Sequence, residues 1–140
     1  MKRSASATWN GGLKDGQGSV STGSGVLTNT RYGFSTRFED QPGSNPEELI
    51  AAAHAACFSM ALSSELGKAG MSPQRIDTKA TLTFDKTDAG FTVTRIHLDT
   101  TASVPGAAAD AFRAAADKAK TGCPISRLLK AEITLEAKLA

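Results

Sequence analysis

The chain has few aromatic residues, few cysteines and no excess of charge of either sign. Its 140 residues include one Trp, one Tyr and two Cys, and 16 basic residues are set against 14 acidic ones, a formal net charge of +2. An even balance without blocks of like charge argues against a nucleic-acid-binding surface and against a polybasic membrane patch.

The sequence also lacks a secretory signal and a long hydrophobic run. Met1, Lys2 and Arg3 lead directly into Ser, Thr and Gly, and the longest stretch poor in charge, residues 49–62, includes His54 and Ser59. Such a stretch is too short and too polar to cross a bilayer, so we expect a cytoplasmic protein without a membrane segment. The cytoplasm keeps thiols reduced, so the two cysteines are either buried bystanders or working thiols.

The length predicts one domain, residues 1–140, with a core of small side chains. Glycine-punctuated residues 5–38 predict two or three short antiparallel strands, and alternating residues 76–84 and 91–102 predict a hairpin. A second helix is expected over 107–120, a helical turn over 124–129 and a strand over 131–139. This order predicts an α+β fold with antiparallel β-sheets around a long central helix.

The central helix has the clearest start signal in the sequence. Asn45 is the expected N-cap, Pro46 occupies the first helical position, and Glu47 and Glu48 fall in the first turn. The helix should run for about 23 residues, to the glycines at 67 and 70. Its middle is apolar nearly all round, which predicts burial on more than one side and a homodimer that covers the second face.

Cys57 falls near the middle of this helix, among alanines. A cysteine in that position is ordinarily an inert core residue. At neutral pH only about 3% of an unperturbed thiol is ionised, and the helix N-terminus is about 15 Å away. If Cys57 reacts, it therefore needs a nearby cation, and one buried Arg would suffice.

Cys123 precedes Pro124 at the expected helical turn. There it would face the free N–H groups of the turn and be accessible from a loop, although a small residue chosen to fit a turn explains it equally well. Together the two cysteines suggest a peroxidatic and a resolving thiol. A Cys–His pair with His54 is geometrically possible, but a core or interface histidine is the simpler reading, and zinc-ligand spacing is absent.

Several motifs resemble the OsmC/Ohr family of hydroperoxide peroxidases, and more closely its osmotically inducible OsmC branch. They are residues 45–50 (NPEELI), 53–62 (AHAACFSMAL), 122–126 (GCPIS) and 36–38 (TRF), with further likeness over nearly the whole chain. The resemblance implies an OsmC-like fold, an intertwined homodimer, and thiol-dependent reduction of organic hydroperoxides. It implies a dithiol reductant such as a lipoylated protein, and no cofactor or metal.

The resemblance assigns the peroxidatic cysteine to Cys57 and the resolving cysteine to Cys123. The family's catalytic arginine falls on Arg37 and its glutamate on Glu47. On an ideal helix Glu47 and Cys57 lie about 15 Å apart, so Arg37 must bridge them or Glu47 must act from the partner chain. Glu48 points away from Cys57 and is better explained as part of the cap.

Apolar residues near these positions predict a pocket that favours bulky alkyl hydroperoxides over hydrogen peroxide. The expected pocket residues are Phe34, Phe38, Phe58 and Met60. Two other functions stay open: an OsmC-like redox sensor or thiol-binding module without significant turnover, and a metal-binding or structural dimer with inert thiols.

Overall fold

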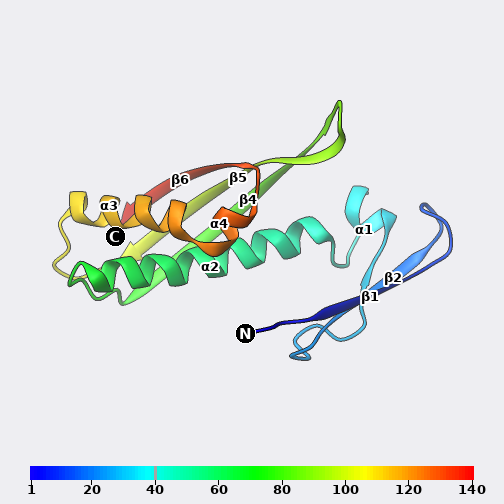
Figure 1. The fold of residues 1–140 in the computed structure, drawn as a ribbon, viewed down its shortest axis with the longest axis horizontal. Coiled ribbons are helices and arrows are strands. Elements are labelled where there is room, and N and C mark those ends of the chain that lie inside the picture. Colours follow the sequence, from blue (N-terminus) through cyan, green and yellow to red (C-terminus); the bar gives the residue numbers. More distant parts are fainter. Residues whose placement is uncertain (40) are drawn as a thin grey trace. The chain divides into compact units, whose positions relative to one another are not determined.

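The computed structural model describes residues 1–39 and 41–140. Its elements follow the order β1–β2–β3–α1–α2–β4–β5–α3–α4–β6, an α+β arrangement with two three-stranded sheets (Figure 1). The chain divides into two compact units, residues 1–49 and 50–140. The first unit holds one sheet and a short helix, and the second holds the other sheet, the longer helices and the main core.

The first unit is a small antiparallel sheet of β1 (Ala5–Asn10), β2 (Gln17–Thr22) and β3 (Thr30–Tyr32). This confirms the short antiparallel strands expected there, of which there are three rather than two. Gly18 lies opposite both Trp9 and Tyr32, and a Cβ at Gly18 would stand 2.4 Å from the Tyr32 ring. The glycine therefore makes room for the two rings, whose centroids are 5.5 Å apart.

Helix α1 (Phe34–Phe38) replaces the end of the predicted strand region. The buried Thr36 holds this single turn in place, since its hydroxyl accepts the Gly33 N–H at 2.9 Å and donates to the Ser44 carbonyl at 2.9 Å. Arg37 thus lies on a helix, and the expectation that residues up to 38 form strands is wrong at this point. Five residues are too few for a hydrophobic period to distinguish helix from strand.

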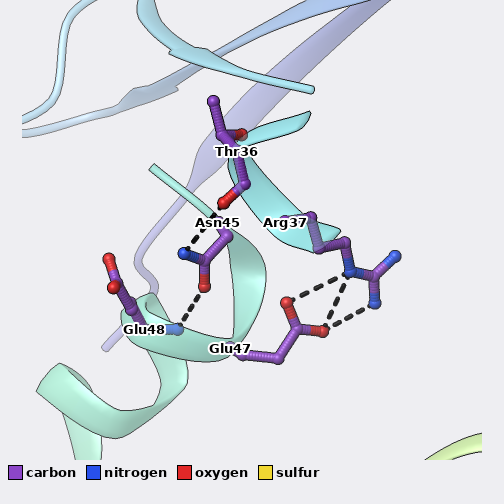
Figure 2. A network of polar contacts seen from close by, with 5 residues as sticks. All are labelled: Thr36, Arg37, Asn45, Glu47 and Glu48. Carbon is purple, nitrogen blue, oxygen red and sulfur yellow. Dashed lines mark hydrogen bonds and ion pairs between the residues drawn. The ribbon is translucent and has the colours of Figure 1, made fainter. Parts of the chain in front are cut away.

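Helix α2 (Pro46–Lys68) begins and ends as the sequence predicts. The Asn45 side chain accepts the Glu48 N–H at 2.8 Å, which satisfies one of the unpaired donors of the first turn (Figure 2). The helix ends before Gly70, whose φ of 74° is readily adopted only by glycine.

The second unit packs α2 and α3 (Ala109–Gly122) against the sheet of β4 (Arg75–Thr87), β5 (Gly90–Ser103) and β6 (Glu132–Leu139). A short helix, α4 (Pro124–Leu128), connects α3 to the last strand. The core takes residues from both helices and the sheet, and its fully buried members include Phe58, Leu62 and Leu66 of α2, Ile96 and Leu98 of β5, and Ala116 of α3.

This second sheet is mixed, which corrects the prediction of purely antiparallel sheets. Strands β4 and β5 form the expected antiparallel hairpin, but β6 runs parallel to β5, with Arg95 opposite Glu132 and Ala102 opposite Leu139. The segment between them contains α3 and α4 and serves as the long crossover that a parallel pair requires. Alternating hydrophobicity marks β6 as a strand but does not encode its direction.

Within the single chain, one face of α2 is buried. Within the chain, its buried residues form one stripe at four-residue spacing: His54, Phe58, Leu62 and Leu66. Small and apolar residues on the other side are exposed, among them Ala52, Ala53, Ala56 and Met60. By length and composition alone α2 could cross a membrane, a test that core helices of soluble proteins also pass. The buried stripe shows one face of α2 engaged in a protein core.

Candidate active site

The two cysteines meet in the second unit although 66 residues separate them in the sequence. The Cys123 thiol donates to the Cys57 sulfur with an Sγ–Sγ distance of 2.9 Å, and both cysteines are free thiols. Cys57 is partly exposed on α2, whereas Cys123 is fully buried. A buried thiol in contact with a partly exposed one is the arrangement that a disulfide-forming pair needs, and the sulfurs reach it without a loop movement.

Backbone hydrogen bonds fix Cys123 between two helices. Its N–H donates to Ala119 in the last turn of α3 at 2.9 Å, and its carbonyl accepts the Arg127 N–H of α4 at 3.0 Å. Pro124 follows as the first residue of α4, where its missing N–H is not needed. The expectation that Cys123 is accessible from a loop is wrong, because these helices and the core enclose it.

Electrostatics within the second unit do not favour a Cys57 thiolate. Burial raises the pKa of the Cys57 thiol above its ordinary value, and the neighbouring Cys123 thiol adds to the rise. The backbone N–H of Ile125 acts in the opposite direction and lowers the Cys57 pKa. We expected the N–H groups of this turn to serve Cys123, but it is Cys57 that receives this one. This one backbone N–H does not offset burial, so a reactive Cys57 thiolate would need a cation.

Arg37 and Glu47 form an ion pair in the first unit (Figure 2). Arg37 Nε lies 3.1 Å from each carboxylate oxygen of Glu47, and Nη2 lies 2.6 Å from Oε1. The arginine comes from α1 and the glutamate from the first turn of α2. The side chain of Arg37 is 35% exposed and that of Glu47 16%, so the pair is accessible from solvent. Several contacts to one carboxylate fix the plane of the guanidinium.

An apolar hollow of about 320 Å³ lies beside Arg37 in the first unit. Half of its lining residues are aromatic, and the guanidinium carbon of Arg37 lies 5.1 Å from the Phe38 ring centre. The lining residues are Trp9, Leu13, Tyr32, Gly33, Phe34, Arg37, Phe38 and Pro46. Sequence reasoning named Phe34 and Phe38 but missed Trp9, Leu13 and Tyr32, which approach only through strand pairing and the turn after β1.

The other two predicted pocket residues lie in the second unit. Phe58 is fully buried in the core, and Met60 is 76% exposed. The predicted site residues therefore form two groups, with Arg37, Glu47, Phe34 and Phe38 in the first unit and Cys57 and Cys123 in contact in the second. Over residues 1–39 and 41–140, no group of three or more His, Cys, Asp and Glu side chains is placed to hold a metal ion.

Comparison with known proteins gives one consistent family. A family model described as OsmC-like protein matches residues 38–138, a range that contains both cysteines and Glu47 and begins one residue after Arg37. Two curated relatives, both named Peroxiredoxin OsmC, come from Escherichia coli (strain K12) and Shigella flexneri. Each is 56% identical over 139 residues, which cover 99% of this chain and 97% of the relative.

Solved structures show the same fold at lower identity. The organic hydroperoxide resistance protein OhrB of Bacillus subtilis matches with a TM-score of 0.66 and 24% identity, covering 98% of each chain. An OsmC like protein from Mycoplasma pneumoniae matches with a TM-score of 0.78 and 15% identity, covering 100% of this chain and 98% of the other. The family match and the near-complete coverage at 56% identity show that the chain belongs to the OsmC family, as a peroxidase of the peroxiredoxin type.

Proposed function

We propose that the chain reduces organic hydroperoxides to alcohols, with Cys57 as the peroxidatic thiol and Cys123 as the resolving thiol. The observation that carries the proposal is the 2.9 Å contact between the two sulfurs, with Cys57 partly exposed and Cys123 buried. Only the exposed sulfur can meet a substrate from solvent. The buried one is placed to react with it afterwards.

The reaction proceeds in three balanced steps. The Cys57 thiolate attacks the distal oxygen of R–O–O–H, the O–O bond breaks, and the alkoxide leaves as R–OH after taking a proton, so Cys57 becomes a sulfenic acid. Cys123 then attacks the Cys57 sulfur, the S–O bond breaks, and water leaves with the formation of a disulfide. An external dithiol, of the kind carried by a lipoylated protein, reduces this disulfide and is itself oxidised.

Arg37 is the cation that the proposal requires. Burial and Cys123 both raise the pKa of Cys57, so a positive charge must compensate them before the first step can run at neutral pH. A guanidinium also stabilises the negative charge that develops as the O–O bond breaks. Glu47 fixes the orientation of Arg37 through the ion pair and acts as its positioning residue.

We propose a homodimer in which the partner covers the exposed face of α2. The uncovered side of this helix carries small and apolar residues, including Ala53, Ala56 and Met60. Helix faces of this composition allow close approach of a second helix. In such a dimer an Arg37–Glu47 pair can serve the Cys57 of either chain. The two units then act as one domain, residues 1–140.

The apolar hollow beside Arg37 supports a preference for bulky alkyl hydroperoxides. Its aromatic walls can remove an alkyl or fatty-acid chain from water, while hydrogen peroxide has nothing to bury there. Four of the matching solved structures are named organic hydroperoxide resistance proteins, one of them as a putative one, which is in line with this substrate class. We propose a cytoplasmic location, where a lipoyl-type dithiol reductant is available, and no resident cofactor.

The first test is turnover of cumene hydroperoxide with excess dihydrolipoamide. The wild type should cycle, Cys57→Ser should be inactive, and Cys123→Ser should consume about one equivalent and then stall, because the sulfenic acid has no resolving partner. Arg37→Ala should lose about a hundredfold or more in kcat/KM. The substitution removes the cation that stabilises the thiolate and the negative charge developing on the breaking O–O bond. Arg31→Ala, which removes another exposed arginine of the first unit, is the matched control and should keep full activity.

Other results would point to the alternatives. If the wild type consumes about one equivalent of hydroperoxide and then stops despite excess dithiol, a redox sensor or thiol-binding module is favoured. No consumption while both thiols stay reduced would reject the enzyme, and a stoichiometric metal found by elemental analysis would favour a metal-binding dimer.

Substrate preference is tested by comparing kcat/KM for cumene hydroperoxide and for hydrogen peroxide. Burial of an aryl or alkyl group should favour the organic substrate by at least about tenfold. Phe38→Ala should reduce this ratio, chiefly through a higher KM for the organic substrate. Equal kcat/KM values for the two peroxides in the wild type would reject the preference.

Oligomeric state is tested by light scattering. The wild type should have about twice the 14.5 kDa mass of one chain. Ala53→Asp places a charge on the exposed face of α2 and should shift the protein towards monomer, because a charge is costly to bury in an apolar interface. Ala114→Asp, on the exposed face of α3, should leave the mass unchanged. A stable wild-type monomer would contradict the dimer.

A further inference from the structure

Helix α4 carries three features that bear on the thiol pair. Cys123 is the residue directly before its first turn, the Ile125 N–H acts on the Cys57 sulfur, and Ser126 bonds to α2. The helix has only five residues, and Pro124, Arg127 and Leu128 are exposed. A helix this short has little stability of its own, so its position depends on contacts to its neighbours.

The contact that ties α4 to α2 is a buried hydrogen bond. His54 Nε2 lies 2.8 Å from the Ser126 hydroxyl, and the His54 side chain is fully buried. His54 Nδ1 has no hydrogen-bond partner among the residues that the structure describes. Burial lowers the pKa of His54, which favours the neutral ring and an uncharged hydrogen bond between Nε2 and Ser126.

A purely structural histidine is a poor explanation for this position. An apolar side chain would fill the same place in the α2 stripe, next to Phe58, without leaving a buried nitrogen unpartnered. An unpartnered polar atom in a core is destabilising, so the bond to Ser126 is the feature that accounts for a histidine here. The sequence allowed two roles for His54, a core or interface residue or a partner of Cys57. In the structure its hydrogen-bond partner is Ser126.

The His54–Ser126 bond runs beside the thiol contact. His54 lies three residues before Cys57 on α2, and Ser126 lies three residues after Cys123. Residues at this spacing are neighbours on one helix face, about 5 Å apart. Besides the Ile125 N–H on the Cys57 sulfur, the same two segments are therefore joined through the two sulfurs and through the imidazole and the hydroxyl. Oxidation of Cys57 changes the atom that the Cys123 thiol and the Ile125 N–H contact, whereas the His54–Ser126 bond does not involve the Cys57 sulfur.

We propose that His54 is a positioning residue for the resolving step, in which its hydrogen bond to Ser126 holds Cys123 against Cys57 while the sulfenic acid is present. This inference rests on the proposed function. In the step it serves, the Cys123 sulfur forms a bond to the Cys57 sulfur, the S–O bond of the sulfenic acid breaks, and the Cys123 proton joins the departing hydroxide as water. Cys123 is oxidised, Cys57 is reduced, and no further reagent is consumed.

The test separates peroxide reduction from disulfide formation in a single turnover. Reduced protein receives one equivalent of cumene hydroperoxide, with and without a 1,3-dione that traps sulfenic acid. Peroxide loss, dione adduct and disulfide are then followed by rapid quench and mass spectrometry. The variants are Ser126→Ala, His54→Leu and His54→Gln, whose amide can donate or accept near the place of Nε2. Ser59→Ala is the matched control, because it removes another hydroxyl hydrogen bond from α2, the 2.8 Å contact to Thr78.

Ser126→Ala and His54→Leu should consume peroxide at a rate within about twofold of the wild type. They should form the disulfide about five- to tenfold more slowly, the factor expected for the loss of one buried hydrogen bond. Their dione adduct should rise accordingly. His54→Gln should recover most of the disulfide rate, and Ser59→Ala should match the wild type.

Two outcomes would overturn the inference while leaving the proposed function standing. If folded Ser126→Ala gives the same ratio of dione adduct to disulfide as the wild type, the His54–Ser126 bond does not position Cys123. Equal slowing in Ser126→Ala and Ser59→Ala would show a general loss of stability. If the wild type itself forms neither sulfenic acid nor disulfide, the proposed function fails, and the resolving step fails with it.

Discussion

The contact between Cys57 and Cys123 is the interaction on which the rest of the account depends. It brings together a mid-helix residue of α2 and the junction of α3 and α4, and the core around it explains how two residues so distant in sequence meet. Phe58, Leu62 and Leu66 hold α2 against the sheet, and the crossover from β5 to β6 returns α3 and α4 to the same core. The parallel pairing of β6 is thus part of what positions Cys123.

The same burial that aligns the sulfurs opposes the first chemical step. It raises the pKa of Cys57, and the Ile125 N–H offsets this only in part. In the proposed mechanism the charge comes from the Arg37–Glu47 pair, which has a fixed orientation and lies beside an apolar hollow. The proposal thus assigns ionisation of Cys57 to an exposed, charged pair and resolution to a buried, neutral thiol.

Local signals in the sequence predicted local structure well. Asn45, Pro46 and the glycines at 67 and 70 marked the ends of α2 because caps and breakers act within a few residues. Long-range features were not accessible: the direction of β6, the burial of Cys123 and the approach of Trp9 to Tyr32 depend on pairings that no periodicity encodes. The roles of Arg37, Glu47 and both cysteines came from family resemblance, whereas the Arg37–Glu47 and Cys57–Cys123 contacts came from the structure.

The most direct measurement of the central claim is the titration of the Cys57 thiol by its ultraviolet thiolate absorbance, with Cys123→Ser as the parent so that one thiol remains. The account predicts that Arg37→Ala moves the inflection to higher pH, because the thiolate loses its cation while burial still opposes its charge. Arg31→Ala should leave the inflection in place. An identical inflection in the parent and in Arg37→Ala would contradict the assignment of Arg37 as the group that ionises Cys57.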